Sequence, residues 1–131
     1  MPGFQSYDRE RIRSRVALTP TGVPPGEVCE IGAKGVQVQW LLAAPEGAPS
    51  FALRRFTLEP DGQTPLHSHP WEHEVHVLQG GGAVITEDGE TPLKPDCAVL
   101  VMPDEVHCFK SGEDGLVFLC LVPLAEATNG H

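Results

Sequence analysis

The sequence predicts an all-β protein with a single domain, and three observations support this fold class. Short apolar runs of strand length recur along the chain, separated by 14 glycines and 13 prolines that are spread through it. No window shows the 3.6-residue repeat of an amphipathic helix. The 131 residues suit one domain, because compact domains most often contain about 100–150 residues. Closing such strands into a barrel or a double-sheet jelly roll protects their edges.

Each apolar run is bounded by residues that favour turns. Pro60-Asp61-Gly62 and Gly80-Gly81-Gly82 are interpreted as turns between strands, and Asp88-Gly89 predicts a tight β-hairpin. The predicted strands are Val36–Leu42, Phe51–Leu58, Val75–Leu78, Ala83–Thr86, Glu90–Leu93, Ala98–Met102 and Leu116–Val122.

The chain divides into an arm, a β-barrel domain and a tail. Residues 1–30 are expected to form a partly irregular arm, because Pro20, Pro24 and Pro25 prevent a long regular element there. The barrel is expected over residues 31–124, and the tail over residues 125–131. Four of the nine basic residues lie in the arm, namely Arg9, Arg11, Arg13 and Arg15.

Composition and charge exclude several classes of partner and location. The net charge is −9, and an acidic body repels nucleic-acid phosphates and anionic membranes. No run reaches the roughly 18 apolar residues of a membrane span, and no secretory signal is visible, so a cytoplasmic protein is expected. The four cysteines contain no Cys-x-x-Cys pair and are expected to be free thiols.

Histidines cluster in one short segment. Alternate side chains of an extended segment share a face, so His67, His69 and His73 point the same way, whereas Glu74 points to the other side. Two imidazoles separated by one residue are well placed to bind one metal ion. His107 lies on a later run and is able to complete the site from across a barrel. The isolated His76 is interpreted as a surface residue.

Two motifs resemble those of the cupin family. Gly62-x4-His67-x-His69-x3-His73, with Gly80 after it, resembles the first cupin motif, and the run from Met102 to Ser111 that contains His107 is similar to the second. The resemblance covers roughly residues 36 to 123. The resemblance implies a cupin double-stranded β-helix, a jelly-roll barrel with one metal ion in its mouth.

The histidine-rich run most resembles small tetra-histidine, manganese-binding bacterial cupins. That resemblance implies four metal ligands, which are His67, His69, His73 and His107. The common cupin pattern instead has glutamate as third ligand, so Glu74 is the alternative to His73. A second departure is Ser111, where the family often has asparagine. The expected cofactor is one divalent ion, manganese first, with iron, nickel, zinc and copper as alternatives.

The predicted function is a metal-dependent, dioxygenase-like enzyme acting on a small organic or aromatic substrate. The alternatives are a non-catalytic metal-dependent sensor or binding module, and a sugar or keto-acid isomerase. Small cupins resembling this one are commonly homodimers, which implies the same here. In that subgroup a cysteine of the last strand lines the metal pocket. The residues predicted to line it are Cys120, Phe109, Phe118, Phe56 and Ile85.

Overall fold

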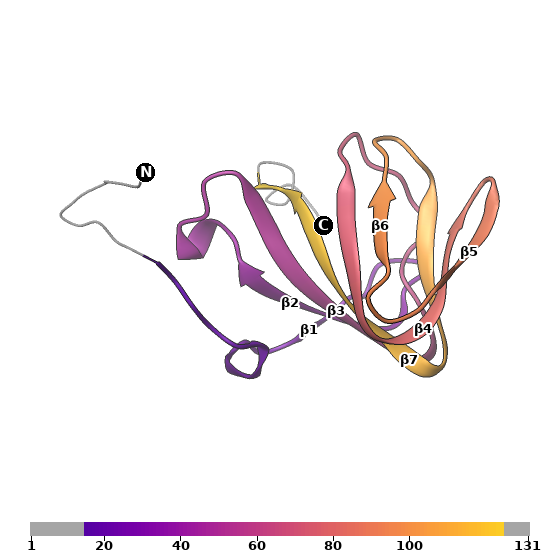
Figure 1. The fold of residues 1–131 in the computed structure, drawn as a ribbon, viewed down its shortest axis with the longest axis horizontal. Coiled ribbons are helices and arrows are strands. Elements are labelled where there is room, and N and C mark those ends of the chain that lie inside the picture. The colour runs from indigo at the N-terminus through magenta and orange to yellow at the C-terminus, as the bar shows by residue number, and fades with distance from the viewer. Residues whose placement is uncertain (1–14, 125–131) are drawn as a thin grey trace.

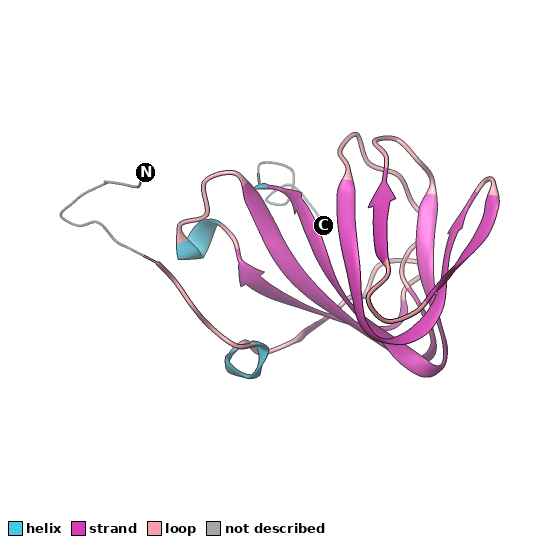
Figure 2. Cartoon of the chain, in the orientation of Figure 1, coloured by secondary structure: helices cyan, strands magenta, loops and turns pink. Residues whose placement is uncertain are grey.

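The apolar runs form antiparallel strands in the computed structural model, which describes residues 15–124. Within that range the regular elements are β-strands and two single-turn 3-10 helices (Figure 1, Figure 2). The helices are η2 (Pro20–Gly22) and η3 (Ala44–Glu46). The strands are β1 (Gly26–Glu27), β2 (Lys34–Leu42), β3 (Phe51–Gln63), β4 (His73–Thr86), β5 (Gly89–Leu93), β6 (Ala98–Val101) and β7 (His107–Pro123).

The strands form one strongly curved sheet in the order β1-β2-β3-β7-β4-β5, and β6 pairs with β4. In Figure 1 the side with β2 and β3 faces the side with β4, β5 and β6, and the two sides join where the long strands bend. Strand β7 pairs with both β3 and β4 and therefore links the two sides. The predicted all-β jelly-roll fold is confirmed.

Two glycine-rich segments that were predicted to be turns lie inside strands. β3 continues through residues 60–62 and β4 through residues 80–82, and the pairing register shifts at both places. Gly80 has a φ of 82°, and a Cβ there would collide with the Gly115 carbonyl group. Glycine is needed because the bulged strand approaches its neighbour too closely for a side chain. The prediction of chain reversal was wrong, since these residues bend strands that continue.

The predicted Asp88-Gly89 hairpin is confirmed, because β4 and β5 pair from Thr86 and Gly89 outward. Within the predicted arm, β1 pairs with β2 of the barrel. Gln39 reinforces this contact by donating from Nε2 to the Pro20 and Val23 carbonyls at 2.8 Å each. The basic residues before Arg15 and the tail lie outside the described residues.

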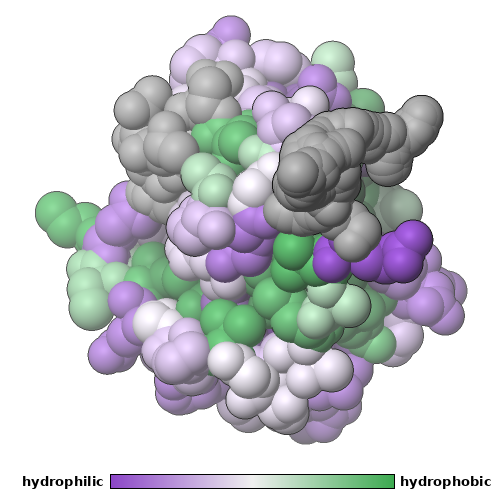
Figure 3. Space-filling view, turned by 90° about the vertical axis from the view of Figure 1, so that its left-hand side faces the viewer, coloured by the Kyte–Doolittle hydropathy of each residue, from purple (hydrophilic) through white to green (hydrophobic). Residues whose placement is uncertain are grey.

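The core lies between the two sides of the curved sheet. Its members are mostly aliphatic, and they alternate with outward-facing residues along each strand. Apolar side chains also reach the surface, as the face drawn in Figure 3 shows. Among the described residues, the exposed large apolar side chains include Ile31, Phe51, Leu66 and Leu100. No helix in the described range is long and apolar enough to cross a membrane.

Candidate metal centre

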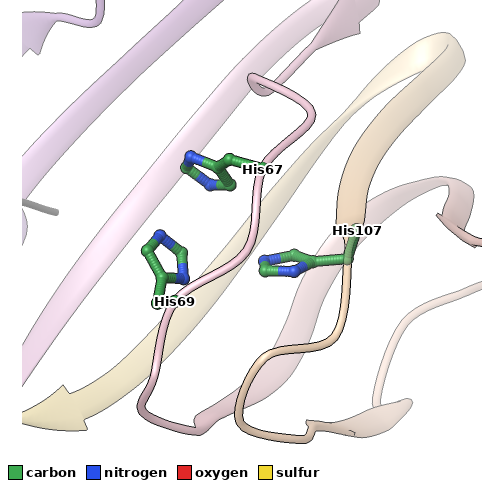
Figure 4. Close-up of side chains that lie close together, drawn as sticks. All are labelled: His67, His69 and His107. Carbon is green, nitrogen blue, oxygen red and sulfur yellow. The ribbon is translucent and has the colours of Figure 1, made fainter.

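Two separate segments bring three histidines together at one end of the barrel. His67 and His69 lie in the loop between β3 and β4, and His107 is the first residue of β7. A β-bridge joins the segments, with His67 N donating to His107 O at 3.1 Å and His107 N donating to His67 O at 2.9 Å. The three imidazoles point toward one another (Figure 4).

These three imidazoles are able to hold a metal ion. One nitrogen from each lies within 4.8 Å of the others. Nitrogens bound to the same ion through bonds of about 2.1 Å lie at most about 4.2 Å apart. A small inward movement of the rings therefore brings the three nitrogens within bonding distance of one ion. His69 and His107 are buried and His67 is half-buried. Imidazole nitrogens suit borderline divalent ions such as iron, nickel, copper or zinc.

A hydrogen bond sets the tautomer of His107. Its Nδ1 lies 2.8 Å from the Glu105 carbonyl oxygen, which only accepts, so Nδ1 carries the proton and donates. Nε2 then has a lone pair available for a metal ion. Such backbone anchoring of the second ring nitrogen is a recurrent feature of metal-binding histidines.

His73 extends the group from the first position of β4. Its side chain is 6% exposed, and its Nε2 lies 2.9 Å from His69 Nδ1. Burial, then the positive charge of Arg54, then the neighbouring imidazoles lower the pKa of His73 from 6.5 to about 2. His73 is therefore neutral at physiological pH. Glu74 is exposed on the outer side of the sheet, away from this group.

The far side of His73 contacts two buried polar groups. Its Nδ1 lies 3.2 Å from Cys120 Sγ and 3.4 Å from Arg54 Nη2. Arg54 also donates from Nη2 to Cys120 Sγ at 3.1 Å. Burial raises the pKa of the Cys120 thiol, against the opposing effect of Arg54. The Arg54 guanidinium lies over the rings of Trp40 and Phe56.

A cavity adjoins the histidines, and most of its lining is apolar. The empty space of this cavity, including the mouth that opens to solvent, is about 520 Å³. The lining includes His67, His73, His107, Arg54, Thr64, Glu30, Phe56, Phe109, Phe118 and Cys120.

Comparison with known proteins places the chain in a family. Residues 54–122 match the family model described as the cupin domain. The chain belongs to the cupin family. No curated protein matches this cupin.

Solved structures resemble this cupin closely in fold. The polyketide cyclase RemF from Streptomyces resistomycificus is 33% identical, with a TM-score of 0.79 over 84% of this chain and 80% of that chain. A cupin 2 domain-containing protein from Halorhodospira halophila is 34% identical, with a TM-score of 0.65 over 68% of this chain and 64% of that one. A predicted oxalate decarboxylase from Thermotoga maritima, 24% identical with a TM-score of 0.73 over 83% of this chain and 99% of that chain, shares the fold.

One residue predicted to line the pocket of this cupin does not do so. Phe56, Phe109, Phe118 and Cys120 border the cavity, but Ile85 does not. In the first half of β4 the residues with odd numbers are buried. Beyond the glycine bulge this changes, and the buried residue is the even-numbered Val84. The register shifts in β4 change which residues face inward, so the outward position of Ile85 follows from the bulge.

Arg54, which is 1% exposed, was not among the predicted site residues. A signal was present, because Arg54 has the same parity as the inward-facing Ala52 and Leu58 of the same strand. A charged residue in phase with a buried apolar face rarely occurs without a role. Thr64 was also overlooked, and its Oγ1 accepts from Phe109 N at 2.8 Å, which attaches the histidine loop to β7.

Proposed function

We propose that this cupin binds a divalent metal ion through His67, His69, His73 and His107 and is a metal-dependent enzyme for a small aromatic substrate. The observation that supports this most is the convergence of imidazoles from separate segments beside an apolar cavity lined by phenylalanines. Manganese is the expected ion, as the resemblance to tetra-histidine cupins implies.

The contact between His73 and His69 supports His73 as the fourth ligand. Two nitrogens bound at right angles to an ion, each at about 2.1 Å, lie about 3.0 Å apart, close to the 2.9 Å between His73 Nε2 and His69 Nδ1. For Nε2 to offer a lone pair, Nδ1 must carry the proton. Cys120 Sγ is then its acceptor, because the Arg54 guanidinium only donates. Glu74 is on the wrong side of the strand for this role.

The cavity supports an aromatic substrate. Phe56 and Phe118 stack with ring centroids 5.1 Å apart, and Phe109 lies 4.8 Å from Phe118. These rings offer a flat apolar contact and exclude water from that side of the site. A divalent ion bound by the histidines supplies a Lewis acid for an oxygen atom of the substrate.

Among reactions of this class, we favour ring closure of a carbonyl-bearing substrate. The 33% identity to a polyketide cyclase over most of the chain supports this choice, and ring closure consumes no external oxidant. The dioxygenase-like reaction stays a prediction of the sequence and is the second candidate. The experiment below also distinguishes the sensor alternative, whereas the isomerase alternative stays a prediction of the sequence.

The decisive experiment measures metal and turnover together. Protein purified without a nickel column is analysed for metal, reconstituted with manganese, iron or zinc, and incubated with diketones, polyketones and phenols on an oxygen electrode. Ring closure with condensation gives a product lighter by one water and no oxygen uptake, whereas oxygenation consumes oxygen. Binding of metal and ligand without any product supports the sensor. Failure to retain metal after reconstitution contradicts the proposal, and His107→Gln is the inactive control.

The homodimer and the cytoplasmic location implied by the sequence stay predictions. Light scattering of the purified full chain measures the first, and a monomer at micromolar concentration contradicts it. Fractionation of the source cells measures the second.

A further inference from the structure

A buried cation without a carboxylate partner borders the cavity. Arg54 is 1% exposed, and within the described range no carboxylate lies at ion-pair distance from its guanidinium. Burying an unpaired charge is costly, and native proteins usually compensate for it with an anion. We infer that Arg54 is an anion subsite of this cavity, which binds the carboxylate or phenolate oxygen of the substrate. This inference rests on the proposed function, because it names the substrate class of the same site.

The surroundings of Arg54 restrict how an anion approaches. Its guanidinium carbon lies 5.2 Å from the ring centroid of Trp40 and 4.9 Å from that of Phe56. Aromatic rings occupy the faces of a guanidinium group, whereas its N–H groups point outward in its own plane. A planar carboxylate or a phenolate oxygen that arrives at this edge is recognised by charge-assisted hydrogen bonds.

The hydrogen bonds of Arg54 leave donors available. A guanidinium has five N–H groups, and its Nη2 contacts Cys120 Sγ and His73 Nδ1. The Nε atom is buried and has no hydrogen-bond partner. A thiol is a weak acceptor, and neither the thiol nor the neutral imidazole carries a negative charge, so they do not compensate the cation. An incoming anion supplies both the missing acceptor and the missing charge.

The position of Arg54 connects the anion to the rest of the site. Arg54 lines the same cavity as His67, His73 and Phe118. The other charged residue in that lining, Glu30, is exposed. An anionic oxygen on Arg54 therefore brings the ring of its own molecule beside the stacked Phe56 and Phe118. A second oxygen of the same molecule is then within the histidine end of the cavity. The inferred substrate is an aromatic or conjugated organic anion.

The experiment titrates metal-free full-length protein with benzoate and 4-nitrophenolate, and with neutral benzyl alcohol, by calorimetry. Metal is removed because a carboxylate also binds metal ions directly. Arg54→Met should weaken binding of at least one anion roughly tenfold or more, as expected for loss of a charge-assisted hydrogen bond, and leave benzyl alcohol unchanged. The neighbouring Arg55→Met is the matched control and should bind like the original protein. Comparison of the two anions identifies which oxygen chemistry the subsite prefers.

A measurement on the unchanged protein covers the case in which Arg54→Met does not fold. Arginine Nε–H resonances are recorded by NMR during the benzoate titration, and the Arg54 signal should shift most. The inference is overturned if the original protein and Arg54→Met bind the anions equally. It is also overturned if the chemical shift of the Arg54 signal does not change at saturation. Failure of the proposed function is distinguishable, because it appears as missing metal while the anion still binds through Arg54.

Discussion

The two polar walls of the cavity differ in origin and in charge. The histidine wall consists of His67, His73 and His107, with His69 beside His73. The arginine wall consists of Arg54, Phe56 and Phe118, with Trp40 beside Arg54. The histidine wall joins a loop to the first residues of β4 and β7. In the arginine wall, neighbouring strands pair Trp40 with Arg54 and Phe56 with Phe118.

The difference lies in what each wall supplies. Imidazoles supply lone pairs and suit a cation, whereas a guanidinium supplies protons and charge and suits an anion. His69, His73, His107 and Arg54 are buried beside an apolar core, and His67 is half-buried. In the proposed function, one wall holds the metal ion and the other selects the substrate. Substitutions in one wall at a time test this division of roles.

Removal of the ring at the base of the arginine wall should give the largest loss of stability. Phe118 is 2% exposed and stacks on Phe56, so Phe118→Ala is expected to lower the free energy of unfolding by about 3–5 kcal/mol. Urea unfolding followed by circular dichroism measures it. Phe51→Ala is the control, because Phe51 is 61% exposed. A loss below about 1 kcal/mol would show that the cavity collapses around the smaller side chain.

Removal of one histidine should abolish stoichiometric metal binding and leave the barrel folded. His107→Gln is expected to weaken metal binding by at least about 100-fold. Loss of a residue that only hydrogen-bonds to a metal ligand already lowers metal affinity about 10–100-fold. Competition with a chelator and elemental analysis measure the change. His76→Gln is the matched control, since the His76 side chain is 48% exposed and faces Asp96. Equal affinity of the two variants would contradict the proposed ligand set.

Acid should destabilise the metal-free protein through His73. The unfolded chain takes up a proton at this residue near its usual pKa of 6.5, whereas burial lowers the folded pKa to about 2. Because the unfolded state then binds more protons, stability falls as pH drops below 6.5, by up to about 1.4 kcal/mol per pH unit. Urea titrations at successive pH values measure the slope. His73→Gln removes this proton, and an unchanged slope in that variant would refute the assignment.

Loss of the sulfur behind His73 should give the smallest effect. Cys120 Sγ lies 3.2 Å from His73 Nδ1, and Cys120→Ala removes this acceptor, so metal binding is expected to weaken about tenfold. Cys120→Ser keeps an acceptor and should recover most of the affinity. Metal titration of both variants measures the difference. Identical weakening of both would indicate that the thiol serves packing alone.

Several features of this cupin could be predicted from local sequence. The spacing of His67, His69 and His73 predicted that these side chains gather, because spacing within one segment is a short-range property, whereas His107 was added through the second motif of the family resemblance. The Asp88-Gly89 hairpin followed from turn chemistry in the same way. The glycine triplet at residues 80–82 could not be assigned correctly, because the same residues permit either a reversal or a bulge and only the neighbouring strand decides between them.

Local sequence was enough to predict the all-β class and the alternation of the histidines along the chain. Long-range strand pairing was needed to leave Ile85 outside the cavity lining and to bring Arg54 against Trp40, Phe56, His73 and Cys120. The physical reason is that side-chain direction alternates reliably only within an uninterrupted strand. Bulges reset that alternation, and the partners of a buried charge come from strands distant in sequence.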